Sequence, residues 1–127
     1  MAGTVVFQAE QISNSSYSPN EVVIFQRITS NAGSGYNSST GKFTAPVAGL
    51  YAFTKQICTG GDAAFTSFVH NVQTVLASMT NPNACSSAQI FVSMTSGDQV
   101  WVQTTLNSDL FSNYYRQTNF AGALIHG

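Results

Sequence analysis

The chain has 127 residues and only nine charged side chains, with a net charge of −1 at pH 7. This length fits a single domain, residues 1–127, with a core that needs no metal to hold it together. It has no basic surface and no apolar run approaching the roughly 20 residues that cross a bilayer, so we expect neither nucleic acid as a partner nor membrane insertion.

Short strands separated by turns are predicted along the whole chain. Val5, Phe7 and Ala9 share one face of the first strand, because alternate residues of a strand point to the same side. The strands predicted in this way span residues 4–9, 22–29, 42–44, 49–57, 64–69, 72–78, 89–94, 100–106 and 118–125. About ten short strands, regularly spaced turns and no helical period indicate an all-β, antiparallel two-sheet sandwich.

One predicted hairpin has an unusual turn sequence. The strands over 64–69 and 72–78 meet near His70 and Asn71, and Val72 follows directly. A β-branched residue resists the positive φ that a type I′ turn requires at both central positions. We therefore expect a turn of another type here, and we interpret His70 as a turn residue and not as a metal ligand.

Seven residues between Phe25 and Phe53 stand at fixed spacing, F-x(5)-N-x(4)-Y-x(6)-F-x(5)-G-x-Y-x-F. This pattern resembles the signature of the complement C1q globular head domain, a branch of the C1q/tumour necrosis factor superfamily. The segment GDQVWV at 97–102 is similar to a turn and strand of that family, and FAGAL at 120–124 resembles its closing strand. The resemblance covers essentially the whole chain.

The resemblance implies a jelly-roll sandwich that assembles as a homotrimer through closed head-to-tail contacts. Since the sequence contains no collagen-like Gly-X-Y repeat, it resembles a stand-alone invertebrate C1q-domain protein without a collagen stalk. The family is mostly extracellular, so we expect a secreted protein although the N-terminal residues do not read as a signal peptide. Four aromatic residues are candidates for either the sandwich core or the threefold contact: Tyr51, Phe53, Trp101 and Phe120.

Cys58 and Cys85 both lie where a predicted strand end meets a loop. Two such cysteines are compatible with one disulfide or with two buried thiols. Some invertebrate members of the C1q family resemble this two-cysteine arrangement, and on that resemblance we expect a Cys58–Cys85 disulfide.

Catalysis finds no support in the sequence. The two histidines, His70 and His126, share no motif with a serine or a cysteine. The five carboxylates are scattered and lack the paired spacing of acid–base catalysis. We therefore expect a binding protein and not an enzyme, with no required cofactor.

The polar loop over residues 107–117 is the most informative candidate binding site. Its candidate ligand-binding residues are Asp109, Asn113, Tyr114, Tyr115 and Arg116. Carboxylate and amide groups can bind sugar hydroxyls, aromatic rings can cover the apolar side of a sugar, and Arg116 could pair with a carboxylate-bearing glycan. In the alternative interpretation, the two tyrosines pack at a boundary between protomers.

Calcium is a secondary expectation. Head domains of the resembling family often bind calcium through loop oxygens near the trimer apex, and the candidates here are Asp62, Asn81 and Asn83. The loop with the two asparagines supplies no carboxylate, whereas calcium favours several hard oxygens with some negative charge.

The function most favoured by the sequence is that of a secreted, lectin-like pattern-recognition protein of innate immunity. Ser, Thr, Asn and Gln make up 48 of the 127 residues, a neutral hydrogen-bonding surface suited to microbial or foreign glycans. Weak individual sites on a trimer would gain avidity from their number. The alternatives are an extracellular structural or matrix assembly protein and a cytokine-like ligand for a protein receptor.

Overall fold

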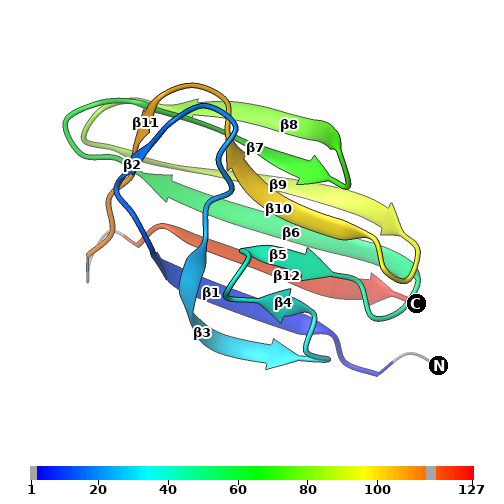
Figure 1. Cartoon of the computed structure of the whole chain (residues 1–127). Coiled ribbons are helices and arrows are strands. Elements are labelled where there is room, and N and C mark those ends of the chain that lie inside the picture. Colours follow the sequence, from blue (N-terminus) through cyan, green and yellow to red (C-terminus); the bar gives the residue numbers. More distant parts are fainter. Residues whose placement is uncertain (1–2, 114–116) are drawn as a thin grey trace.

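Two five-stranded antiparallel sheets face each other in the computed structural model, which describes residues 3–113 and 117–127 (Figure 1). The strand orders are β3-β1-β12-β6-β9 in the first sheet and β4-β5-β10-β7-β8 in the second, while β2 and β11 form a separate two-stranded pair. The strands are β1 (Val6–Ile12), β2 (Ser16–Tyr17), β3 (Phe25–Ala32), β4 (Tyr36–Asn37), β5 (Lys42–Thr44), β6 (Gly49–Cys58), β7 (Ala64–His70), β8 (Gln73–Thr80), β9 (Cys85–Met94), β10 (Gln99–Thr104), β11 (Ser108–Asp109) and β12 (Asn119–His126). The expected all-β jelly-roll sandwich is confirmed.

Strand ends differ from the sequence-based expectation where pairing extends a strand. Strand β9 begins at Cys85, inside an expected loop, because its pairing with β6 continues as far as Cys58. Strand β3 continues to Ala32 because it pairs with β1 up to Val6. The two-residue strands β2, β4 and β11 are too short to show a periodic pattern and are not predicted. Among the described residues, no helix is long and apolar enough to cross a membrane.

An aromatic cluster centred on Phe7 fills the space between the sheets. The ring centroids of Phe43 and Phe120 lie 5.0 and 4.9 Å from that of Phe7. Gly122 pairs with Phe7 on one side and with Phe53 on the other. A Cβ atom at Gly122 would lie 2.5 Å from the Phe53 ring and 2.7 Å from the Phe7 ring, so only glycine leaves room for both.

The spaced residues of the signature hold the fold together. The Tyr36 hydroxyl donates to the Phe25 carbonyl (2.7 Å) and accepts from the Phe25 N–H (3.1 Å). The Asn31 side chain donates to the Tyr36 carbonyl (2.9 Å) and accepts from the Tyr36 N–H (3.1 Å). Burial raises the pKa of Tyr36 to about 12, so its hydroxyl stays neutral. These contacts give Phe25, Asn31 and Tyr36 structural roles.

The β7–β8 turn is not of type I′, as the sequence predicts, but His70 is the last residue of β7 and not a turn residue, which corrects that interpretation. His70 pairs with Gln73, which leaves Asn71 and Val72 as the two turn residues. Only Asn71 has a positive φ, of 57°, so the turn is not type I′. His70 Nε2 lies 3.1 Å from Asp98 Oδ2, which links this hairpin to the β9–β10 turn.

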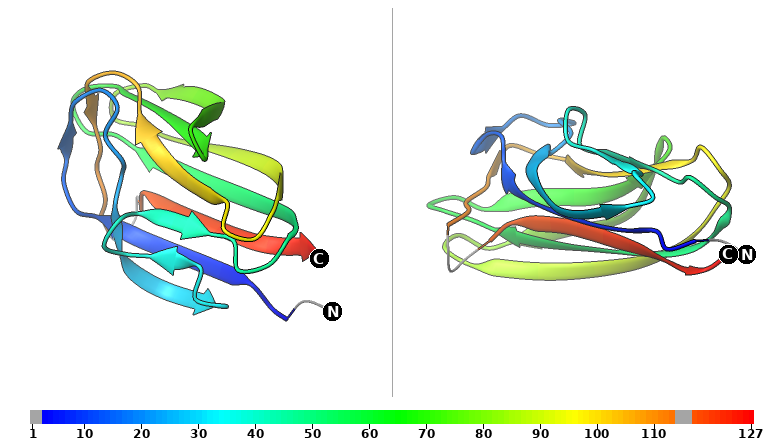
Figure 2. Two further views of the ribbon diagram at one scale, coloured as in Figure 1. Left: turned by 45° about the vertical axis from the view of Figure 1, so that its right-hand side comes forward. Right: turned by 90° about the horizontal axis from the view of Figure 1, so that it is seen from below.

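The first strand begins and the last strand ends at the same end of the sandwich (Figure 2). The start of β1 and the end of β12 are neighbours, and the Leu124 N–H donates to the Val5 carbonyl at 2.9 Å. At the other end of the same strand pair, Glu10 is opposite Asn119. The loop over 107–117 therefore approaches the sandwich at the end away from the termini.

A lysine side chain lies inside the sandwich. Lys55 shares the inward face of β6 with Phe53 and Ile57 and is 1% exposed. Its Nζ donates to Thr66 Oγ1 at 2.8 Å and lies 4.9 Å from the ring centroid of Phe68. Desolvation lowers the pKa of Lys55 to about 7, because the charged amine is costly away from water.

Lys55→Met is expected to stabilise the fold by about 1–4 kcal/mol below pH 7, since it replaces a buried amine with an apolar chain of similar size. In the wild type, the unfolded chain keeps the Lys55 proton up to about pH 10.5, whereas the folded chain releases it near pH 7. Wild-type stability should therefore rise with pH between these values.

Urea unfolding at about pH 6, 8 and 9.5 measures this dependence. Lys55→Met should lose the rise, and Lys42→Met, at a half-exposed position of β5, should keep it. A wild-type protein with constant stability across this range would contradict the prediction.

Candidate functional site

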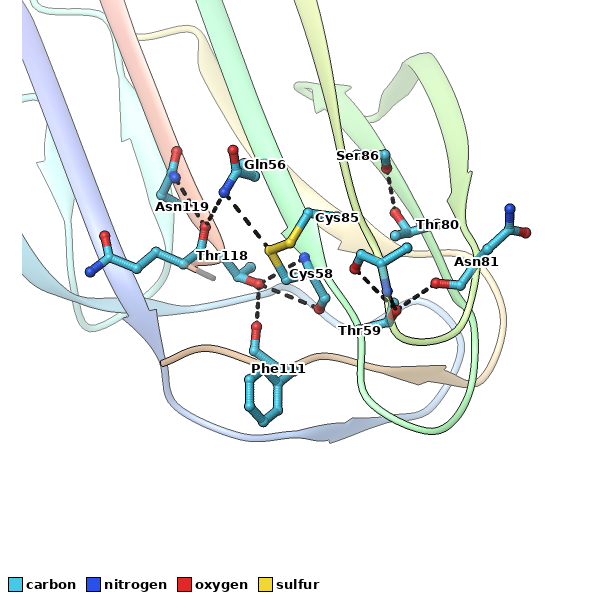
Figure 3. Close-up of a disulfide and its surroundings, with 12 residues drawn as sticks. Gln56, Cys58, Thr59, Thr80, Asn81, Cys85, Ser86, Phe111, Thr118 and Asn119 are labelled. Carbon is cyan, nitrogen blue, oxygen red and sulfur yellow. Dashed lines mark hydrogen bonds between the residues drawn. A yellow bond between two sulfur atoms is a disulfide. The ribbon is translucent and has the colours of Figure 1, made fainter. Parts of the chain in front are cut away.

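A disulfide lies beside the predicted binding loop (Figure 3). Cys58 and Cys85 are directly opposed on β6 and β9, with Cα atoms 4.0 Å apart, and their sulfurs are bonded. The predicted bridge is thus present. Cys58 is fully buried and Cys85 is exposed. In the chain-entropy model, closing a loop of this length stabilises the fold by roughly 3–4 kcal/mol.

Cys58 also anchors the second half of the loop, through Phe111 and through Thr118, which follows the loop directly. The Phe111 N–H donates to the Cys58 carbonyl (2.8 Å), and the Cys58 N–H donates to Thr118 Oγ1 (3.0 Å). The Thr118 hydroxyl in turn donates to the Phe111 carbonyl (2.7 Å), as Figure 3 shows. Nearby, Gln56 Nε2 donates to the Gln117 carbonyl (2.9 Å). Positions 111, 117 and 118 are therefore held against the end of β6.

A first hollow, of about 480 Å³, opens between the anchored loop and strands β1 and β3. It is lined by Glu10, Gln11, Ile12, Arg27, Ser112, Asn113 and Gln117. Glu10 and Arg27 are paired across β1 and β3, with Glu10 Oε1 3.9 Å from Arg27 Nε. Gln11 has a φ of 63°, a conformation that residues with a side chain rarely adopt in a strand.

A second hollow, of about 530 Å³, contains the predicted acidic residues. Asp62 and Asp109 line it together with Tyr17, Asn107 and Ser108. The Asp62 N–H donates to Asp109 Oδ2 at 3.2 Å. One role of the Asp109 carboxylate is therefore to hold the turn that contains Asp62.

The structure separates the residues that the sequence groups into one ligand site. Asp109 lines the second hollow, whereas Asn113 lines the first. The expectation that these two side chains lie close together is corrected for a physical reason: Asp109 pairs with Ser16 in the β2–β11 ribbon, and Leu110 is buried directly after it. Tyr114, Tyr115 and Arg116 lie outside the described residues.

The structure also shows where the three residues predicted to bind calcium lie. The Asn83 N–H donates to the Gly60 carbonyl at 2.7 Å, and the Asn81 carbonyl accepts from the Thr59 hydroxyl, so their loop lies over the 59–60 turn. Asp62 is instead beside Asp109 in the second hollow. Within residues 3–113 and 117–127, no three His, Cys, Asp or Glu side chains form a group able to hold a metal. Calcium binding by Asp62, Asn81 and Asn83 stays a prediction.

The candidate aromatic residues divide between the core and the outer face of a sheet. Tyr51, Phe53 and Phe120 are completely buried within one chain and belong to its core cluster. Trp101 points away from that cluster, where its Nε1 donates to Gln103 Oε1 at 2.8 Å. Lys42 Nζ lies 4.3 Å from the centre of the Trp101 ring, a cation–π contact.

Three residues that line the first hollow could not be identified as site residues from the sequence. Glu10 and Gln11 belong to β1 and Arg27 to β3, far along the chain from the loop that completes the hollow. Only the pairing register brings them together, so a search for local motifs does not find them.

The jelly-roll sandwich, with two hollows at its loop end away from the termini, has the architecture of the C1q/tumour necrosis factor type. The chain matches the C1q domain over residues 6–125 and belongs to that family. It is 32% identical to mouse complement C1q tumor necrosis factor-related protein 2 over 109 residues. The aligned region covers 80% of this chain and 37% of that protein. The chain thus spans less than half of the length of this curated relative.

Solved structures show the same fold. The globular domain of the zebrafish complement 1qA protein has a TM-score of 0.77 at 19% identity, covering 95% of this chain and 97% of that one. Eiger TNF from S. frugiperda has a TM-score of 0.74 at 11% identity, covering 98% of this chain and 94% of that one. At these identities, the likeness concerns the fold alone.

Thr118→Val is expected to destabilise the protein by about 1–3 kcal/mol, because it removes the hydroxyl that joins the Cys58 N–H to the Phe111 carbonyl inside the fold. Denaturant unfolding measures the loss. Thr54→Val is the matched control, at an exposed position of the same β6, and should change stability by less than about 0.5 kcal/mol. Equal effects of the two substitutions would contradict an anchoring role for Thr118.

Proposed function

We propose that this protein is a secreted, lectin-like recognition protein that binds microbial or foreign glycans as a homotrimer. The observation that carries the proposal is the first hollow, an open site whose lining is mostly amide and hydroxyl groups and whose loop wall is anchored at both ends. Such groups exchange hydrogen bonds readily with sugar hydroxyls. Membership of the C1q domain family supports a role in pattern recognition and innate immunity.

The arrangement of the ionisable groups supports binding over catalysis. His70 is engaged with Asp98 at the junction of two hairpins, and Asp109 holds a turn. The Thr95 backbone N–H, followed by the His70 side chain, lowers the pKa of Asp98 to about 2, so this carboxylate stays charged and is a poor proton carrier near neutral pH. His70, Asp98 and Asp109 therefore all have structural roles.

The outer face of the first sheet supports assembly with further copies of the chain. Val6, Ala123, Ala52 and Phe91 form one row across four neighbouring strands. The small side chains of this row border a shallow, largely apolar hollow of about 240 Å³, and Phe91 is 64% exposed. A contiguous apolar face of this kind is typical of surfaces that bind another protein chain.

Assembly into a trimer would make a weak site useful. A shallow, open hollow binds a single sugar weakly, because little of the ligand leaves water. Three linked copies convert later contacts with a repetitive glycan surface into intramolecular events and so raise the overall affinity. The proposed trimer and the proposed glycan site therefore support each other.

A glycan array probed with the purified protein tests the binding function. We expect selective binding that persists when calcium is replaced by a chelator, because the proposal needs no cofactor. Tyr115→Ala and Arg116→Ala test two predicted ligand-binding residues that lie outside the described part of the chain, and they should reduce the signal. Loss of signal on chelation alone would place calcium in the mechanism. A blank array from a confirmed trimer would refute the glycan proposal in favour of a protein partner or a matrix role.

Light scattering coupled to size exclusion tests the assembly surface. The wild type should have three times the chain mass of 13.5 kDa. Ala123→Arg should give a folded monomer, because it places a charge in the apolar row. Ser39→Arg, in an exposed turn away from this face, should remain trimeric. A wild-type monomer, or an Ala123→Arg trimer, would overturn this surface as the contact.

A further inference from the structure

We propose that the first hollow binds a neutral sugar unit and discriminates against acidic sugars, with Glu10 as the residue that sets this preference. The inference rests on the proposed glycan-binding function and adds its ligand class. It uses only described residues: the β1 segment Glu10–Ile12, Arg27 of β3, and the loop residues Ser112 and Gln117.

Three consecutive residues of one strand line this hollow, which a regular strand does not allow. Successive side chains of a strand point to opposite faces, so the alternation that buries Phe7 and Ala9 would direct Gln11 into the core. The positive φ of Gln11 breaks the alternation, leaves its side chain exposed and turns Ile12 against the core. Backbone strain of this kind concentrates at functional sites.

The charges of the hollow point to a neutral ligand. Glu10 and Arg27 are the only charged residues among the described lining, and their side chains lie 3.9 Å apart. The Glu10 side chain is only 13% exposed, whereas that of Arg27 is 68% exposed and extends toward solvent. Because the Arg27 guanidinium is paired with Glu10, a sugar carboxylate in the hollow would have to compete with the Glu10 carboxylate for it, and the two like charges at close range would disfavour binding.

The remaining lining matches a polyhydroxylated ring. A carboxylate accepts hydrogen bonds from two neighbouring hydroxyls, while the amides of Gln11 and Gln117 and the Ser112 hydroxyl both donate and accept. Bonds to the charged Glu10 acceptor are the stronger ones. Ile12 adds an apolar wall beside these groups.

Two lining residues of the loop, Ser112 and Gln117, lie beside positions that are held in place before any ligand arrives. Ser112 follows Phe111, and Gln117 precedes Thr118, so both lining residues adjoin the anchors on Cys58. The Gln117 carbonyl also accepts from Gln56. Preorganisation of this kind lowers the entropy lost on binding.

A glycan array with matched pairs of neutral and sialylated oligosaccharides tests the inference. The wild type should bind neutral members and give a weaker signal on their sialylated partners. Glu10→Gln keeps the shape and removes the charge, so it should weaken neutral binding by about tenfold and reduce the discrimination. Gln11→Gly keeps the positive φ and removes the side chain, so it should weaken neutral binding while the protein stays folded.

Glu21→Gln, at a carboxylate that lines neither hollow, is the matched control and should bind like the wild type. Thermal unfolding of each variant separates a lost site from a lost fold. Wild-type binding restricted to sialylated glycans would overturn the inference, as would neutral binding that survives both Glu10→Gln and Gln11→Gly in full. In these cases the proposed glycan function would stand, whereas a blank array would refute that function and this inference together.

Discussion

The architecture depends on the packing of Phe7 and Phe53 against Gly122, which lies between them on the middle strand of the first sheet. Because a side chain at Gly122 would occupy the space of both rings, this row admits a single arrangement of β1, β12 and β6. A register shift by one residue would turn the row to the other face of the sheet. The same register places Glu10 at the loop end and Val6 beside the chain terminus. The position of the first hollow thus follows from an aromatic contact in the core.

The loop end is organised by a second, covalent constraint. The disulfide joins β6 to β9 at their common end, and Cys58 carries the hydrogen bonds that hold Phe111 and Thr118. A loop rich in polar residues loses considerable conformational entropy when it is ordered. The bonds to the end of β6 offset part of that loss for Phe111, Gln117 and Thr118. The core and the disulfide therefore determine two opposite walls of the same hollow.

Patterns that depend on alternation were sufficient to predict most of the fold. The buried side of β9, for example, follows from its period of two, with Val92 buried and Phe91 exposed. The same alternation also places Lys55 on the inward face of β6, although its charge argues against burial. The first hollow could not be predicted, because it depends on a positive φ at Gln11, a backbone feature that a glutamine does not signal. The separation of Asp109 from Asn113 could not be predicted either. It depends on the pairing of β11 with β2, and a pairing of two residues is too short to leave a pattern in the sequence.

The position of the two chain ends has a mechanical consequence. Strands β1 and β12 run antiparallel as neighbours, and the Leu124–Val5 hydrogen bond lies nearest to both termini. A force that pulls the termini apart would load this bond first and then each following pair in turn, as in a zipper. Strands pulled in shear would share the same load among all of their bonds at once. The domain should therefore yield at low tension when it is stretched between its ends, whereas a tether at one end alone would leave the strand pair unloaded and the hollows facing away from the attachment.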